Sequence, residues 1–311
     1  MKKSIISNYK GILSVLVLGL SVLVLIQLRE QLADVKIINP YYLLLAILLI
    51  AAFMVVNGLI TKRLLKCFGL DLEVRESIAL SILNTLGNMI TPFRGGMVSN
   101  AIYLKDRYKL DYSNFVAMLS ATYVVVFWLN SLIGLIVCIY IKFAIGIFSW
   151  PIFAIFLLGT VILTIVMLFS PKINETRIPI VNKIVYVVNK WNLINKDKNL
   201  IMTLLLFSLL NTTLIVFINY FEFLAIGIYV SFEKLVFLSV FSIYSLFLSI
   251  TPANLGVKEA FAVYSGLIVN ISAPNVIVVS LVDRFLIVIV VLIFSFPASY
   301  LLMNKRNSKT Y

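Results

Sequence analysis

Long runs of apolar residues dominate the sequence, and short segments rich in lysine and arginine separate them. A run of about 20 apolar residues can cross a bilayer as a helix. Six runs are therefore predicted to be transmembrane helices: residues 11–28, 41–60, 115–141, 151–169, 200–223 and 276–302. Basic residues precede the first run, as in a signal peptide. It is nevertheless predicted to be an uncleaved helix, because no small-residue cleavage site follows it.

Two further apolar stretches, residues 78–93 and 235–252, contain several polar residues and run into a Thr-Pro pair followed by glycine. Proline removes a backbone donor and disfavours helical backbone at the residue before it, while glycine adopts conformations that other residues resist. Each stretch is therefore predicted to be a re-entrant helical hairpin that leaves the membrane on the side where it entered. Irregular backbone at membrane depth must be covered by protein or line a cavity.

The two Thr-Pro pairs begin at Thr91 and Thr251, and the same offset of 160 residues aligns Gly96 with Gly256. Three predicted spans lie between the hairpins, so the hairpins enter from opposite sides, which is typical of an inverted-topology repeat. The chain is predicted to be a single all-α integral membrane domain, residues 1–311, with about six transmembrane helices and two re-entrant hairpins. Repeat 1 comprises a hairpin at 78–113 and a span at 115–141. Repeat 2 comprises a hairpin at 235–273 and a span at 276–302.

Composition and charge agree with this interpretation. The 311 residues are 62% hydrophobic, which excludes a water-soluble domain. The net charge of +13 could indicate a nucleic-acid partner. However, the predicted topology places 20 basic residues on one side of the membrane and four on the other. This asymmetry follows the positive-inside rule, so a cell-membrane protein with cytoplasmic termini and no nucleic-acid partner is expected.

Missing residue types narrow the chemistry. The chain has no histidine, which excludes a Ser-His-Asp triad and the common zinc sites. Its two cysteines stand singly, and no phosphate-binding loop motif occurs. No catalytic residue, metal or cofactor is therefore predicted.

Both hairpins combine polar amides, a helix break, glycine and a cation. A helix that starts after the glycine offers N–H groups and a positive dipole end, and Arg94 and Lys258 add full charge, so an anion site is predicted. The alternative is that Thr-Pro only kinks a helix and that both cations extend to the interface. The candidate substrate-binding residues are Asn88, Thr91, Pro92, Arg94, Gly96, Thr251, Pro252, Asn254, Gly256, Lys258, Glu259, Asp283 and Arg284.

Asp283 and Arg284 lie inside the last apolar run. A charge at this depth costs on the order of 3 kcal/mol, and adjacent helical positions do not face each other. Each residue is therefore expected to find a partner elsewhere: Glu259 or a bound phosphate for Arg284, and Lys258 or Arg94 for Asp283. An ion pair that only fixes helix packing is the alternative.

Three motifs occur in order along the chain: Thr91-Pro92-x-x-Gly95-Gly96, Pro252-x-Asn254-x-Gly256-x-x-Glu259, and Ser280-x-x-Asp283-Arg284. In these motifs the chain resembles the flippase-like membrane domain family, which includes the membrane part of lysylphosphatidylglycerol synthase/flippase. That family also places an acid-Arg pair in the span after its first motif. Tyr123 and Val124 occupy those positions here.

The resemblance implies a non-enzymatic lipid translocase that moves an anionic or aminoacylated phospholipid, or a polyprenyl-phosphate-linked glycan, between leaflets. Nine residues follow Leu302, so no aminoacyl-transferring synthase domain is expected. One alternative is an accessory scaffold that docks a glycosyltransferase through basic segments such as residues 170–199. Another is a lipid-modifying transferase with Glu259 or Asp283 as base. A homo-oligomer is a further partner to consider, and Glu222, Glu259 and Asp283 are the acids that could carry a coupling proton.

Overall fold

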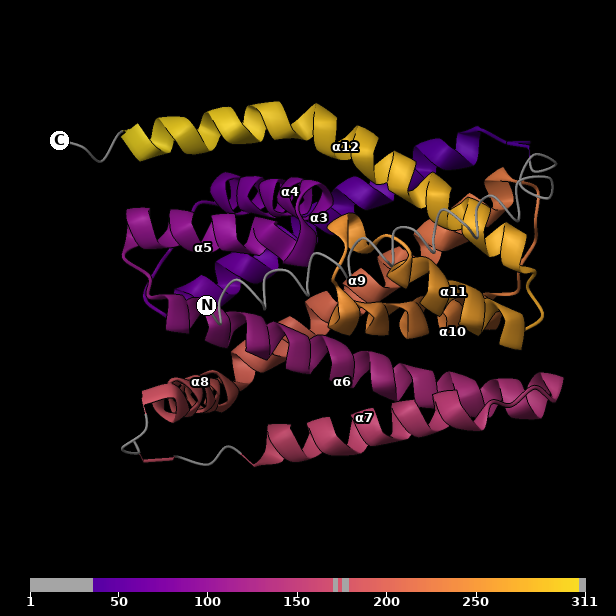
Figure 1. Ribbon diagram of the computed structural model, residues 1–311, viewed down its shortest axis with the longest axis horizontal. Coiled ribbons are helices and arrows are strands. Elements are labelled where there is room, and N and C mark those ends of the chain that lie inside the picture. Colours follow the sequence, from indigo (N-terminus) through magenta and orange to yellow (C-terminus); the bar gives the residue numbers. More distant parts are fainter. Residues whose placement is uncertain (1–35, 170–172, 175–178, 308–311) are drawn as a thin grey trace, which may run out of the picture.

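The computed structural model describes residues 36–169, 173–174 and 179–307, and every element within these ranges is helical. The span predicted at residues 11–28 lies outside them. Five helices are long and apolar enough to cross a membrane. They are α3 (Tyr41–Lys66), α6 (Tyr112–Ile145), α7 (Trp150–Leu168), α9 (Lys198–Ala225) and α12 (Ala273–Asn307). These helices correspond to the other five predicted spans and run along the length of the molecule (Figure 1).

Both Thr-Pro stretches are broken helices, as predicted. The first hairpin consists of α4 (Val74–Ile90), the short turn η1 (Pro92–Arg94) and α5 (Gly95–Tyr108). The second consists of α10 (Phe232–Ser242), η2 (Ile243–Leu248), η3 (Pro252–Asn254) and α11 (Val257–Ile268). The paired helices of the first hairpin extend toward one end of the molecule and those of the second toward the other (Figure 1).

The ends of the first hairpin differ slightly from the predicted range of 78–113. Helix α4 begins at Val74 because Glu73 before it is extended, with a ψ of 148°. Helix α5 ends at Tyr108 because Lys109 is left-handed, with a φ of 57°. The chain then enters α6 at Tyr112. The hairpin therefore begins and ends a few residues before the hydrophobic pattern indicated.

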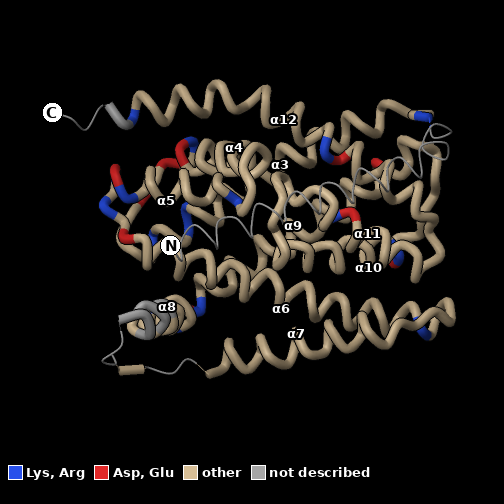
Figure 2. Tube along the Cα trace, in the orientation of Figure 1, with Lys and Arg blue, Asp and Glu red and all other residues tan. Residues whose placement is uncertain are grey.

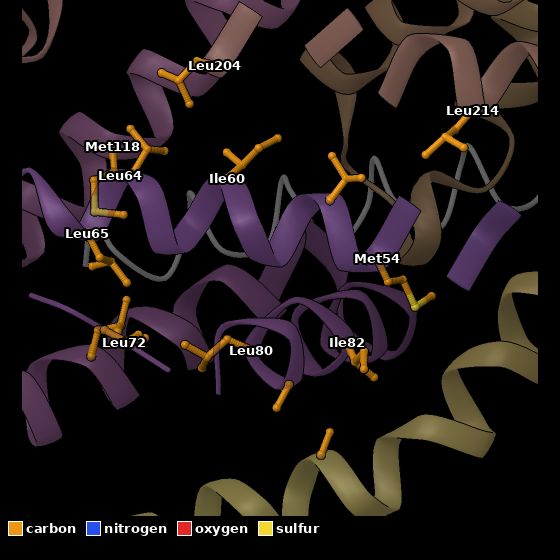
Figure 3. Packing of buried hydrophobic residues seen from close by; sticks show 14 of the residues in the cluster. Met54, Ile60, Leu64, Leu65, Leu72, Leu80, Ile82, Met118, Leu204 and Leu214 are labelled. Atoms are coloured by element: carbon orange, nitrogen blue, oxygen red, sulfur yellow. The ribbon is translucent and has the colours of Figure 1, made fainter. Parts of the chain in front are cut away.

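Two clusters of apolar side chains hold the helices together, and each hairpin packs into a different one. The first cluster surrounds α3 and includes Leu80 and Ile82 of α4 and Leu104 of α5. Figure 3 shows its side chains packed between α3 and its neighbours. The second cluster includes Phe241 of α10 and Phe156 of α7. Each hairpin is thus anchored in its own apolar cluster. Contact between the hairpin tips therefore depends on the relative position of the two clusters.

Helix α8 (Pro179–Lys196) lies in the basic segment formed by residues 170–199. Its Trp191 is only 6% exposed and donates a hydrogen bond from Nε1 to the carbonyl of Val166, over 3.2 Å. Ile194 is fully buried. This face of α8 therefore packs on the protein rather than on lipid.

A buried carboxylate ties the base of the first hairpin to the end of α12. Glu76 is 1% exposed and accepts hydrogen bonds from the hydroxyls of Tyr103 and Tyr108, over 2.8 and 2.7 Å. The Nζ of Lys305 lies 3.2 Å from its other oxygen. Charged residues gather at this end of the molecule (Figure 2). Because its oxygens are well satisfied, Glu76 acts as a fixed joint between α4, α5 and α12.

Candidate functional site

The two hairpin tips share an unusual backbone path. Phe93 and Arg94 have φ values of 55° and 56°, and Ala253 and Asn254 have values of 52° and 57°. This left-handed conformation costs a non-glycine residue about 1–2 kcal/mol. Such strain persists only where surrounding structure enforces it, and it clusters at functional sites. The two pairs are 160 residues apart, so the offset found in the sequence corresponds to the same local geometry.

The tips contact each other, and Arg94 reaches from the first to the second. Its Nη2 donates hydrogen bonds of 2.8 Å to the carbonyl of Leu246 and to Oγ of Ser249. Its Nη1 donates to the hydroxyl of Tyr123, and the guanidinium lies 5.4 Å from the centre of that ring. No carboxylate among the described residues forms an ion pair with Arg94. This cation is therefore held by neutral groups.

The second tip is held from outside by α12. Arg284 donates from Nη1 to the carbonyl of Ala253 over 2.8 Å and from Nη2 to that of Asn254 over 3.3 Å. Its Nε lies 2.5 Å from Oε1 of Glu259. One guanidinium thus satisfies both carbonyls of the left-handed pair and is itself neutralised.

A second ion pair lies beside it. The Nζ of Lys258 is 2.5 Å from Oδ2 of Asp283. Asp283 therefore pairs with Lys258, and Arg284 pairs with Glu259. Each partner is one of the two that were predicted from the sequence. Consequently, two of the three cations predicted to hold an anion already have a carboxylate partner.

The amides expected to be free at the helix starts are occupied. The N–H of Gly96 donates to Oδ1 of Asn88 over 3.1 Å. The N–H of Gly256 donates to Oε2 of Glu259 over 2.7 Å, which caps α11. In the described conformation these two N–H groups are therefore satisfied by polar side chains of their own hairpins. Asn88 and Glu259 thereby gain structural roles.

The remaining predicted residues shape the turns. Pro92 and Pro252 each begin a short 3-10 turn. The hydroxyl of Thr91 donates to a carbonyl four residues earlier, over 2.5 Å, and that of Thr251 to one four residues later, over 2.7 Å. Asn254 donates from Nδ2 to the backbone and the hydroxyl of Ser245. These bonds stabilise the broken backbone.

A cavity of about 400 Å³ lies where the tips meet. The predicted residues that line it are Asn88, Arg94, Thr251, Asn254, Lys258, Asp283 and Arg284. A smaller cavity of about 280 Å³ shares Asn254, Lys258 and Asp283 with the first. Ligand pockets usually measure about 300–1,000 Å³, so the volume of the larger cavity lies within the range of ligand sites.

Several residues of the site were missed by the sequence prediction. Tyr123 contacts Arg94, and Asn57 and Asn84 line the larger cavity. Oδ1 of Asn84 is buried and accepts no hydrogen bond within the described part of the chain. Their positions in the sequence could have indicated this role, because Asn57, for example, is a polar residue inside the predicted apolar run at 41–60. Polar groups inside a span usually face a cavity or another helix.

Two broken hairpins that meet at a charged cavity among spanning helices define a multi-pass membrane protein with an internal polar site. The sequence also matches a known family of membrane proteins. The model of the lysylphosphatidylglycerol synthase transmembrane region matches residues 11–295, which include both hairpins, and the chain belongs to this family. The resemblance found in the motifs is thereby confirmed. No curated protein matches the sequence.

Proposed function

We propose that the protein binds the anionic head group of a lipid where the hairpin tips meet and moves that lipid between leaflets. The family relates to membrane lipids, which supports a lipid as partner. The observation that carries the proposal is Arg94, a cation beside a cavity of about 400 Å³ with no carboxylate partner among the described residues. A phosphate offers the planar guanidinium charge-assisted, bidentate hydrogen bonds, which are stronger than those to neutral groups.

Apolar side chains around Arg94 support a lipid rather than a soluble anion. Phe93 precedes Arg94, and Phe247 and Leu248 lie between its two acceptors on the second hairpin. All three are exposed, Phe247 by 66%. Exposed apolar groups in a spanning protein face acyl chains. In the proposed mode the head group enters the cavity while the lipid chains remain in the bilayer.

The topology is part of the same proposal. The hairpins extend toward opposite ends of the molecule, which supports re-entrant elements in an inverted-topology repeat (Figure 1). Charged residues concentrate at the end that holds the base of the first hairpin (Figure 2). We assign this end and both termini to the cytoplasm, in a cell membrane. Two hairpins that reach the same cavity from opposite sides would give each leaflet a route to it.

The proposal assigns no enzymatic step. A transferase would need Glu259 or Asp283 as a base, and each of them is in an ion pair with Arg284 or Lys258. In the described conformation both carboxylates are therefore already engaged by a cation. The accessory scaffold depends on residues 170–199, part of which lies outside the described residues. Translocation is therefore the function that the described geometry favours.

The test is leaflet exchange of labelled phosphatidylglycerol in liposomes that contain the purified protein. A hydrogen bond to a charged group contributes about 1.5–3 kcal/mol, so Arg94→Ala is expected to slow exchange about 10-fold or more. Arg75→Ala is the matched control, because Arg75 is exposed at the base of the same hairpin. Equal exchange by wild type and Arg94→Ala would contradict the proposal. If the protein were instead a lipid-modifying transferase, mass spectrometry would show that the mass of the lipid had changed.

A further inference from the structure

Glu222 is a buried acid that the proposed lipid site does not use. It lies in α9 and has no exposed surface. Neither carboxylate oxygen accepts a hydrogen bond from the described residues. An ionised carboxylate in such a place costs several kcal/mol, because nothing replaces the water that it loses. The described conformation therefore fits the neutral, protonated form of Glu222.

The charged groups that act on Glu222 come from two other helices, Lys258 of α11 and Asp283 of α12. The other helices packed against α9 place no charged group near Glu222. Helix α3 carries no charge before Lys62. The charges of α10, Glu233 and Lys234, and the charge of α6, Lys142, lie at the ends of those helices. Helix α8 meets α9 near its opposite end, where Lys198 begins it. Glu222 is thus coupled to one ion pair.

Apart from Arg94, the charges around Glu222 balance when Glu222 is neutral. Lys258 offsets Asp283, and Arg284 offsets Glu259. Ionisation of Glu222 would leave one excess negative charge. The smaller cavity is lined by Asn219 and Phe223, which flank Glu222, and it extends to Lys258 and Asp283. This cavity lies beside Glu222 and connects its part of α9 with the ion pair at the lipid site.

We propose that Glu222 is a proton-binding site whose occupancy is linked to the binding of an anion where the hairpin tips meet. The inference rests on the proposed function, because it takes that anion to be the lipid head group. A protonated Glu222 leaves Lys258 balanced by Asp283 alone, whereas an ionised Glu222 adds negative charge behind Lys258 and opposes a second anion. The linkage is reciprocal. At a pH where ligand-free Glu222 is ionised, binding of the anion therefore draws a proton from water onto this carboxylate, and release returns it.

The first experiment needs no ligand. Infrared spectra of the purified protein are recorded for wild type, Glu222→Gln and the control Glu233→Gln, whose acid lies in the first turn of α10. The carbonyl stretch of a protonated carboxylic acid is expected in wild type and Glu233→Gln and is expected to be lost in Glu222→Gln. A spectrum that Glu222→Gln leaves unchanged would overturn the inference.

The second experiment measures binding of a short-chain phosphatidylglycerol in detergent by calorimetry, in buffers of different ionisation enthalpy and at several pH values. Wild type is expected to take up protons on binding at the pH values where ligand-free Glu222 is ionised, and its affinity is expected to fall about fivefold or more as pH rises, the lower end of typical coupling between sites. Glu222→Gln is expected to bind without either effect. Glu222→Asp, which restores an acid, is expected to regain both and guards against a misfolded variant.

These outcomes separate the two proposals. Equal proton uptake by wild type and a folded Glu222→Gln would overturn the linkage and leave the lipid site in place. If no variant binds the lipid, the lipid site is refuted and the linkage with it. The infrared band would then still identify Glu222 as a proton site.

Discussion

At the first hairpin tip the arginine is part of the tip and reaches outward, whereas at the second tip the arginine comes from α12 and holds the tip from outside. Arg94 itself occupies a left-handed position, and Asn254 occupies the equivalent one. Arg284 donates to the carbonyl of Asn254 and is neutralised by Glu259. The same strained backbone is thus stabilised in two ways, and only the first leaves a cation without a carboxylate among the described residues.

One position explains much of this difference. The 160-residue offset that aligns the tips also aligns Tyr123 with Asp283. Asp283 supplies a carboxylate to Lys258, whereas Tyr123 gives Arg94 a hydroxyl and an aromatic ring. A hydroxyl accepts a hydrogen bond without cancelling the charge. The cations at the second tip are therefore neutralised, whereas the first tip keeps the charge that the proposed lipid site requires.

Loss of Arg284 should have the largest effect on stability. Arg284→Ala leaves Glu259 without its ion-pair partner and removes the donor from two carbonyls, so a loss of about 3–5 kcal/mol is expected. Arg94→Ala breaks bonds to neutral groups and should cost much less. Denaturant unfolding in detergent measures both. Equal losses would remove the asymmetry between the tips.

Glycine substitutions test how each tip is packed. A Cβ at Gly96 would overlap the backbone of Asn84 and Asn88, so Gly96→Ala should separate α4 from α5 and cost about 1–3 kcal/mol. Gly256 has a φ of 83°, so Gly256→Ala should cost about 1–2 kcal/mol through backbone strain. Because Arg94 directly precedes the first helix start, only Gly96→Ala is expected to slow lipid exchange strongly. Similar slowing by both variants would count against a special role of the first tip.

Tyr123 gives the smallest expected change in stability and a sharp functional contrast. Tyr123→Phe removes one hydrogen bond to Arg94, worth about 1 kcal/mol, and should leave lipid exchange largely intact. Tyr123→Asp places a carboxylate where the second tip has Asp283 and should suppress exchange by pairing with Arg94. Exchange and unfolding are measured on the same preparations. Exchange that survives Tyr123→Asp would show that an unpaired Arg94 is not required.

The sequence predicted the elements of this protein well, because span length and helix breaks are local properties. Apolar runs located five of the spans that the structure describes, and the two Thr-Pro pairs located the breaks. The adjacent charges at Asp283 and Arg284 indicated that each needed a separate partner, and the partners lie among those considered. Such inferences use spacing within one segment and the cost of a charge in the bilayer.

The contacts across the site could not be predicted in the same way. Arg94 bonds to Leu246 and Ser249, which lie about 150 residues away, and nothing in either segment indicates this approach. The capping role of Glu259 was missed because its carboxylate serves Gly256 and Arg284 together. These features depend on how the two apolar clusters sit together, which the pattern of each segment does not encode.

The buried Glu76 makes α12 a link between the two hairpins. Lys305 fixes one end of the helix to the base of the first hairpin, and Arg284 fixes its middle to the tip of the second. The 20 residues between these anchors form a helical segment of roughly 30 Å. Helix α12 thus connects the base of the first hairpin directly to the tip of the second. Pro297 lies between the anchors and lacks the N–H that would donate to the carbonyl four residues earlier, so α12 is expected to bend there.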